Sequence, residues 1–299
     1  MSLVQTQSRV LGSLPPVGPL SFGTWRFTDE DPTTGRVVLE AAIESGMNLI
    51  DTADVYGFDW GGTGFGQVED ILGRLLASTS GLRDRIVLAT KGGIAPPTPY
   101  DSSPKYLRSA VEASLRRLQT DVIDLYQIHR PDMYAHPADV AITLNALREE
   151  GKIREVGVSN HTTAQVAALQ AHLEFAIASN QPEYSATHLD PMRDGTLDQC
   201  MELHITPMAW SPLGGGGLAT GDGLRPELLD VMNRLAEREG VDRSQIALAF
   251  VLAHPSAPIA IIGSQNPDRI RSSSAALGVT LDRNDVYDIV QASEGVPLP

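Results

Sequence analysis

Eight short apolar runs, each ending in polar residues, recur along the chain and alternate with stretches of helical spacing. Such an alternation predicts strand–helix units, because strands buried on both faces of a parallel sheet are almost continuously apolar. Eight units favour an α/β fold of one closed (β/α)8 TIM barrel over an open doubly wound sheet. The predicted strands are Leu20–Thr24, Met47–Asp51, Ile86–Lys91, Val122–His129, Val156–Ser159, Ile177–Gln181, Thr206–Ser211 and Ile259–Gly263.

The stretches between the first predicted strands have the period of amphipathic helices. In residues 37–42, 68–75 and 107–118, apolar side chains recur every three or four positions. The 299 residues suffice for one barrel, which typically needs about 250. No repeat or linker divides the chain, so we expect one domain over residues 1–299.

An open dinucleotide-binding sheet usually has a Gly-x-Gly-x-x-Gly turn after its first strand, and this chain lacks that turn. The glycine-rich stretch Gly61–Gly66 has another spacing and follows the second predicted strand. We interpret it as a flexible loop, with a phosphate cradle as the alternative.

The charge and cysteine content exclude several classes of partner. A net charge of −14 opposes nucleic-acid binding, which depends on clustered Lys and Arg. Cys200 is the single cysteine, so neither an internal disulfide nor a multi-thiolate metal site can form. The sequence has no signal-like start and no apolar stretch near the roughly 20 residues of a membrane span. We therefore expect a cytoplasmic protein with no membrane partner.

Polar residues at the ends of the predicted strands indicate where a site lies. In a barrel of parallel strands the carboxyl ends meet at one mouth, so these residues converge although they are far apart in sequence. The residues at or just beyond those ends are Asp51, Tyr56, Lys91, His129, Ser159, Asn160, Gln181 and Trp210.

Four of these residues form a chemical set for carbonyl reduction. Tyr56 is a weak acid that needs a nearby cation to favour its phenolate, and Lys91 can supply that charge. Asp51 can keep a buried Lys91 protonated, and His129 can donate a hydrogen bond to a carbonyl. Singly, each also has a structural interpretation: Asp51 could cap a turn and Lys91 could be solvated. Likewise, Tyr56 could pack in a loop and His129 could bond only to backbone.

Other catalytic classes fit less well. The sequence has no Gly-x-Ser-x-Gly elbow, no phosphate-binding Gly-x-x-x-x-Gly-Lys loop and no His-Glu-x-x-His helix. His129 and His136 lie on either side of Pro131 and read as loop residues. We therefore expect no metal site.

Several motifs in order resemble the signatures of the aldo-keto reductase family. They are Met47–Gly57, read as MNLIDTADVYG; Ala89–Lys91; Asp124–Asp132, read as DLYQIHRPD; and Gly157–Asn160. The resemblance extends from about Gly18 to Leu277. The stretches that begin at Ala209 and Ile261 are similar to a bacterial branch of predicted oxidoreductases in this family.

The resemblance implies a small-molecule carbonyl or alcohol substrate and an NADP(H) cofactor extended across the barrel mouth. Tyr56 is then the general acid, Asp51 and Lys91 its tuning pair, and His129 the residue that orients the carbonyl. Asn160 has a helix cap as its alternative role, and the glycines after Leu213 a mobile lid. The implied contacts of the nicotinamide and pyrophosphate are Gly23, Thr24, Ser159, Asn160, Gln181, Trp210, Ser211, Leu213 and Gly214.

For the 2′-phosphate the resemblance implies Ser264 and Arg269, at the start of a helix that begins near Pro267. Gly263 stands where many members have lysine. Ser272 and Ser273 replace the acidic and amide residues expected on the adenine side. The sequence therefore predicts NADPH as the favoured cofactor, with weak discrimination against NADH; a plain surface arginine is the alternative for Arg269.

Aromatic residues after the first two predicted strands indicate the substrate pocket. We hypothesise that some of them wall it and favour aromatic or apolar aldehydes: Trp25, Phe27, Phe58, Trp60 and Phe65. Three functions stay open. They are a carbonyl reductase, a sugar or alcohol dehydrogenase, and a nucleotide-sensing interaction protein like the potassium-channel β-subunit relatives in this family.

Overall fold

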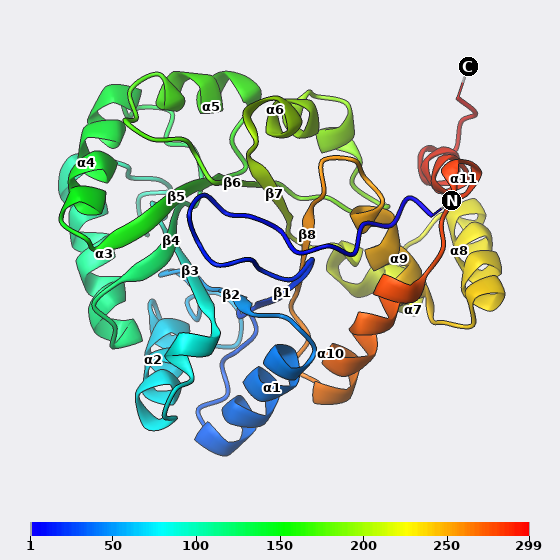
Figure 1. Ribbon diagram of the computed structural model, residues 1–299, viewed down its shortest axis with the longest axis horizontal. Coiled ribbons are helices and arrows are strands. Elements are labelled where there is room, and N and C mark those ends of the chain that lie inside the picture. The colour runs from blue at the N-terminus through cyan, green and yellow to red at the C-terminus, as the bar shows by residue number, and fades with distance from the viewer. Residues whose placement is uncertain (1, 299) are drawn as a thin grey trace.

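The computed structural model describes residues 2–298 and has a closed barrel of eight parallel strands (Figure 1). Each strand pairs with its neighbours in sequence, and β1 pairs with β8 to close the barrel. The predicted (β/α)8 fold is confirmed. The strands are β1 Leu20–Gly23, β2 Leu49–Asp51, β3 Val87–Gly92, β4 Ile123–Ile128, β5 Ile153–Ser159, β6 Ser179–Gln181, β7 Thr206–Ala209 and β8 Ile259–Ile262.

The helices cover the outside of the barrel (Figure 1). Several begin where the sequence supplies a cap and a proline: the Asp31 side chain accepts a hydrogen bond from Thr33 N just before Pro32, and Ser103 precedes Pro104 in the same way. The helices are α1 Pro32–Glu44, α2 Gln67–Ser78, α3 Pro104–Leu118, α4 Pro137–Glu149, α5 Thr163–Gln170, α6 Thr196–Leu203, α7 Gly217–Thr220, α8 Pro226–Glu239, α9 Arg243–Leu252, α10 Pro267–Ser273 and α11 Arg283–Glu294.

Strand β5 begins at Ile153, three residues before the predicted start at Val156. Two charged residues, Arg154 and Glu155, interrupt the apolar pattern there, but both are satisfied by partners. Arg154 is exposed and its Nη1 atom lies 2.8 Å from Asp124 Oδ1. Glu155 is buried and its Oε1 accepts hydrogen bonds from the backbone and hydroxyl of one residue, Ser13.

The N-terminal segment closes one end of the barrel. It crosses the open end of the strands in Figure 1, and Arg9 and Val17 form an antiparallel bridge within it. Leu11, Leu14 and Val17 pack there on a second apolar cluster inside the barrel. That cluster includes Leu49, Val87, Ala89, Leu125, Ala178, Met208, Ile259 and Ile261. The opposite, carboxyl end of the strands is therefore the end available for a site.

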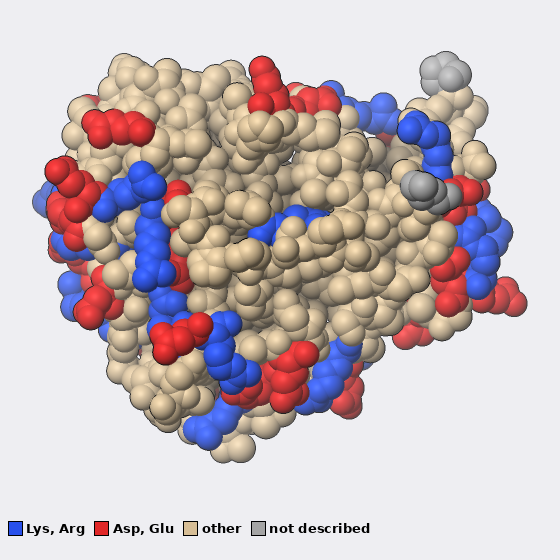
Figure 2. Space-filling view, viewed as in Figure 1, with Lys and Arg blue, Asp and Glu red and all other residues tan. Residues whose placement is uncertain are grey.

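Charged side chains on this closed end lie mainly at the periphery, over the helices, where acidic and basic groups are intermixed (Figure 2). Exposed ion pairs among the described residues include Arg85 with Glu40, at 2.9 Å, and Arg108 with Glu150, at 2.8 Å. Among the described helices, none is long and apolar enough to cross a membrane.

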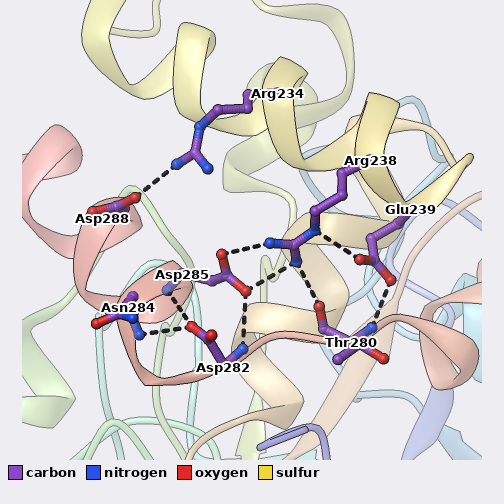
Figure 3. Close-up of polar contacts among 8 residues, drawn as sticks. All are labelled: Arg234, Arg238, Glu239, Thr280, Asp282, Asn284, Asp285 and Asp288. Atoms are coloured by element: carbon purple, nitrogen blue, oxygen red, sulfur yellow. Dashed lines mark hydrogen bonds and ion pairs between the residues drawn. The ribbon is translucent and has the colours of Figure 1, made fainter.

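An ionic network joins α8 to α11 (Figure 3). The guanidinium of Arg238 donates to both carboxylate oxygens of Asp285, at 2.8 and 2.9 Å, and to Thr280 O at 2.7 Å. Asp285 also accepts a hydrogen bond from Asp282 N, within the cap of α11. In contrast, Arg234 makes one contact with Asp288, at 2.7 Å, between two exposed side chains.

These geometries predict different costs for two matched substitutions. Arg238→Met leaves the buried Asp285 carboxylate without its bidentate partner and should lower the free energy of unfolding by about 1–3 kcal/mol. Arg234→Met removes one solvent-screened pair and should cost less than about 1 kcal/mol. Urea denaturation measures both, and equal losses would show that the network adds nothing beyond a surface pair.

Candidate active site

The four candidate catalytic side chains meet at the carboxyl end of neighbouring strands. Asp51 ends β2 and Lys91 lies near the end of β3. His129 follows β4, and Tyr56 lies in the loop that leaves β2. Lys91 Nζ is 2.6 Å from Asp51 Oδ2 and 3.3 Å from Tyr56 OH. The structure therefore brings these residues together as the sequence predicts.

The buried Lys91 ammonium is fully hydrogen-bonded. Its third acceptor is the carbonyl oxygen of Thr52, at 2.9 Å. Burial alone lowers the pKa of Lys91, but attraction to Asp51, together with the hydrogen bonds, outweighs it and raises the pKa. Lys91 is therefore a fixed positive charge beneath Tyr56, and the interpretation of Lys91 as a solvated side chain is wrong.

The Asp51 carboxylate faces the barrel interior and does not cap a turn. Its Oδ1 accepts hydrogen bonds from Gln127 Nε2 at 3.2 Å and from Gln181 Nε2 at 3.0 Å, while Oδ2 binds Lys91. Gln127 is the penultimate residue of the buried strand β4, and the sequence analysis missed it. The signal that could have found it is a polar glutamine near the carboxyl end of a buried strand.

Tyr56 is protonated at neutral pH. Burial raises the pKa of its phenol, and the neighbouring Lys91 lowers it only in part, so the net shift is upward. Lys91 acts in the predicted direction, since it lowers the pKa of Tyr56, but it opposes the effect of burial without overcoming it. A phenol is the form that can donate a proton.

His129 is neutral and has an unused ring nitrogen. Burial, with the charges of Lys91 and Arg130, holds the pKa of His129 well below its usual range. Its ring contacts Tyr56 edge-on, with ring centres 5.8 Å apart. Its backbone N–H donates to Gly92 O, whereas Nδ1 has no hydrogen-bond partner within residues 2–298. A neutral imidazole can donate to a carbonyl without adding charge.

A chain of hydrogen bonds joins four of the predicted nicotinamide contacts. Trp210 Nε1 donates to Asn160 Oδ1 at 2.9 Å, and Asn160 Nδ2 donates to Ser159 Oγ at 2.8 Å. Ser159 Oγ in turn donates to the carbonyl oxygen of Gln181, at 2.9 Å. Helix α5 is capped by Thr162, so the alternative role of Asn160 as a helix cap is wrong. Asn160 instead has a φ of 55°, in the left-handed region.

Gly23 and Thr24 lie where β1 ends, beside Asp51. Thr24 is fully buried, and both its backbone N–H and its hydroxyl donate to Asp51 O, at 2.9 and 3.2 Å. A Cβ at Gly23 would lie 2.7 Å from the Ile261 side chain, so only glycine fits there without a shift. Thr24 thus holds the backbone of Asp51 in place.

The segment after β7 forms a tight glycine turn. Ser211 has a φ of 54°, its Oγ accepts from Gly215 N at 2.9 Å, and its carbonyl accepts from Gly214 N at 2.8 Å. Gly214, Gly215 and Gly216 all have positive φ and lead directly into the one-turn helix α7. Leu213, partly buried, packs against the core at the start of this turn.

Ser264 and Arg269 flank the capped start of α10. Asn266 Oδ1 accepts from the backbone N–H groups of Asp268 and Arg269, and Ser264 Oγ accepts from Asn266 N at 3.2 Å. The helix begins at Pro267, as predicted. The Arg269 side chain is exposed and makes no ion pair with any described residue.

The positions next to Arg269 offer little to a ligand. The hydroxyls of Ser272 and Ser273 both donate back to Arg269 O, at 3.0 and 2.7 Å. A Cβ at Gly263 would meet no atom within 4 Å, so space exists there but no side chain fills it. Arg269 is thus an exposed arginine without an ion pair among the described residues, and its neighbouring hydroxyls are bonded to its own carbonyl.

Two of the predicted pocket aromatics lie together at the mouth. The rings of Trp25 and Trp60 are 4.9 Å apart and both side chains are exposed, with Arg26 over the two rings at 5.5 and 5.2 Å. Phe58 is also exposed in the loop after β2. The prediction that Phe27 could wall the pocket is wrong, because Phe27 is buried in the core against Phe22.

A second carboxyl group lies buried behind Lys91. Asp54 is fully buried, and neither carboxylate oxygen has a hydrogen-bond partner among the described residues. The Tyr126 hydroxyl, also without a partner among the described residues, and Asp54 Oδ2 both lie against Gly92, where a Cβ would overlap the hydroxyl and lie 3.2 Å from Asp54 Oδ2. Burial and the nearby Glu69 raise the pKa of Asp54 well above its usual range. Burial therefore favours the protonated form of Asp54, which lies in the same loop as Tyr56.

No group of three or more potential metal ligands occurs within residues 2–298. At the mouth, the Tyr56 phenol lies between the buried Lys91 ammonium, which it contacts at 3.3 Å, and the edge-on ring of His129.

Comparison with known proteins defines the family. The family model for the aldo/keto reductase family matches residues 19–294, and the chain belongs to this family. It is 46% identical over 286 residues to a protein named 6-dehydroglucose reductase from Novosphingobium aromaticivorans, covering 95% of this chain and 94% of the relative. It is 35% identical over 286 residues to a protein of the same name from Agrobacterium fabrum, covering 92% and 93%.

A solved structure of an aldo/keto reductase from Klebsiella pneumoniae, in complex with NADP and acetate, superposes with a TM-score of 0.80. The two chains are 29% identical, and the match covers 99% of this chain and 97% of the other. The protein is thus an aldo-keto reductase of the oxidoreductase class.

The buried Asp54 predicts a pH-dependent difference in stability. Because its pKa is raised on folding, the folded state holds a proton that the unfolded state releases, and stability falls as pH rises from the unfolded pKa towards the folded one. Asp54→Asn removes this proton uptake while keeping the shape. The stability of the variant relative to the natural chain should therefore increase from pH 5 to pH 8.

Thermal unfolding at both pH values measures this difference. Asp59→Asn, at an exposed position of the same loop, is the matched control and should show no such trend. If the difference in stability between Asp54→Asn and the natural chain is the same at both pH values, the raised pKa of Asp54 is contradicted.

Proposed function

We propose that this chain is an NADPH-dependent reductase that converts the aldehyde group of a sugar-type substrate to an alcohol, with Tyr56 as the proton donor. The observation that carries the proposal is the contact of Tyr56 with the buried, charged Lys91, at 3.3 Å. Tyr56 is then a protonated acid, and the adjacent Lys91 ammonium would stabilise the phenolate that forms when it gives up its proton.

Each member of the set has one role in this proposal. His129, neutral at its ring, donates to the carbonyl oxygen and orients it towards Tyr56. As negative charge develops on that oxygen, the phenol gives up its proton, and Lys91 stabilises the phenolate that remains. Asp51 keeps Lys91 protonated and in place. The cofactor supplies the hydride when it is bound.

The residues at the mouth fit such a cofactor. Arg269, exposed at a helix start and without an ion pair within residues 2–298, suits the 2′-phosphate. The glycine turn after Ser211, with positive φ at Ser211 and Gly214, would let the backbone approach a pyrophosphate closely. Asn160 and Trp210, joined by a hydrogen bond, would border the nicotinamide. We extend the same proposal to weak discrimination against NADH, because Gly263 adds no second cation.

The substrate class rests on the relatives that carry the name 6-dehydroglucose reductase. A sugar aldehyde suits the paired Trp25 and Trp60 rings, because aromatic faces can pack on the apolar C–H faces of a sugar. We propose a sugar aldehyde in place of the aromatic or apolar aldehydes that the sequence favoured. Because the relatives are named as reductases, we also favour reduction over a pure sensing role.

Tyr56→Phe tests the proposed acid. Removal of the hydroxyl should lower kcat/KM for aldehyde reduction by about 10²–10⁴, the usual contribution of a general acid. The Kd for NADPH should not change, because the phenol does not serve the cofactor. Tyr287→Phe, on the exposed side of α11, is the control and should keep full activity. Full activity of Tyr56→Phe would remove Tyr56 from the mechanism.

Arg269→Gln tests the cofactor preference. Loss of a charge-assisted phosphate contact should raise the Kd for NADPH by about 10- to 100-fold, while the Kd for NADH stays the same because NADH lacks the 2′-phosphate. Quenching of tryptophan fluorescence measures both constants. Arg283→Gln, an exposed arginine on α11, is the control. If the substitution changes the Kd values for NADPH and NADH equally, Arg269 does not contact the 2′-phosphate.

A further inference from the structure

Two partly buried arginines have no polar partner in the structure. Within residues 2–298, Arg26 and Arg130 are the arginines that are partly buried and yet make neither an ion pair nor a side-chain hydrogen bond. The other partly buried arginines all bind a carboxylate or a carbonyl; examples are Arg83, Arg117 and Arg243. Both unpaired arginines follow strands at the carboxyl end of the barrel.

Arg130 is the one closest to the reacting groups. It follows His129 directly in sequence, and its guanidinium carbon lies 5.8 Å from the centre of the Trp210 ring. Its charge is also close enough to lower the pKa values of both His129 and Tyr56. Arg130 therefore lies close to both His129 and Tyr56, the two groups proposed to act on the carbonyl.

A guanidinium in this position is incompletely satisfied. Contact with an indole ring stabilises its positive charge but leaves its five N–H donors without acceptors. Partial burial removes part of the water that would otherwise bind them, and this loss is recovered only when oxygen atoms of a ligand approach. The N–H groups of Arg130 are therefore available to donate hydrogen bonds to a bound molecule.

We propose that Arg130 is a specificity-determining residue that donates hydrogen bonds to hydroxyl oxygens near the substrate carbonyl, so that hydroxylated aldehydes are preferred over plain ones of the same length. This inference rests on the proposed reductase function. Hydroxyl oxygens are the acceptors proposed because the proposed substrate class is a sugar aldehyde. A sugar aldehyde has such hydroxyls on the carbons beside its carbonyl.

The test compares D-glyceraldehyde with propanal, which has the same carbon chain and no hydroxyl, using NADPH and the full-length protein. Arg130→Met should lower kcat/KM for D-glyceraldehyde by about 10-fold or more, the scale of a lost hydrogen bond from a charged donor. kcat/KM for propanal should change less than about threefold. Arg130→Lys, which keeps the charge and loses the planar fork, should fall between the two.

Arg74→Met, at an exposed and unpaired arginine of α2, is the control and should leave both substrates unaffected. Unchanged thermal unfolding of Arg130→Met would exclude a folding defect. An equal loss on both aldehydes would overturn the inference and leave the reductase proposal intact. Failure of the natural chain to reduce either aldehyde would instead remove the reductase proposal, and this inference with it.

Two further measurements separate other ligands. If Arg130→Met weakens NADPH binding, the arginine serves the cofactor and the inference is wrong. If Arg130→Met loses activity only on glyoxylate, an anionic aldehyde, Arg130 binds a carboxylate and the inference is again wrong. A loss confined to D-glyceraldehyde, with an unchanged Kd for NADPH, would establish it.

Discussion

The ion pair between Asp51 and Lys91 is the contact on which the mouth of the barrel depends. The ammonium is completely removed from water, so loss of its partner would leave an uncompensated buried charge. The same carboxylate accepts hydrogen bonds from Gln127 and Gln181, and through these contacts it ties β2 and β3 to β4 and β6. The electrostatics of Tyr56 and the geometry of the strand ends are therefore set by one buried pair.

The architecture was largely predictable from the sequence because buried parallel strands leave a simple signal, an apolar run with a polar end. The signal fails where charge enters a strand. The early residues of β5 include Glu155, which is tolerated because Ser13 of the N-terminal segment binds it. The closure of the barrel by Leu11 and Leu14 was not predictable either. These two leucines close the barrel because they pack against strands that are far away in sequence.

The convergence of Asp51, Tyr56, Lys91 and His129 was predictable because strand ends must meet in a barrel. What the sequence could not supply was the balance of energies at each group. Whether burial or Lys91 dominates the pKa of Tyr56 depends on solvent access, which only the packed structure defines. For the same reason Phe27 and Trp25, two residues apart, have opposite fates: one fills the core and the other stays exposed. Arg130 was likewise hidden inside a motif dominated by its neighbour His129.

The hairpin that seals one end of the barrel has a practical consequence for redesign. Leu11, Leu14 and Val17 close the amino-terminal end of the strands, whereas Trp25, Trp60 and Arg130 lie on loops at the other end. Mutational libraries confined to those loops leave the sealing contacts untouched. Immobilising the protein through the sealed end would also keep the mouth turned towards the solution, so one surface can serve attachment while the other is re-engineered.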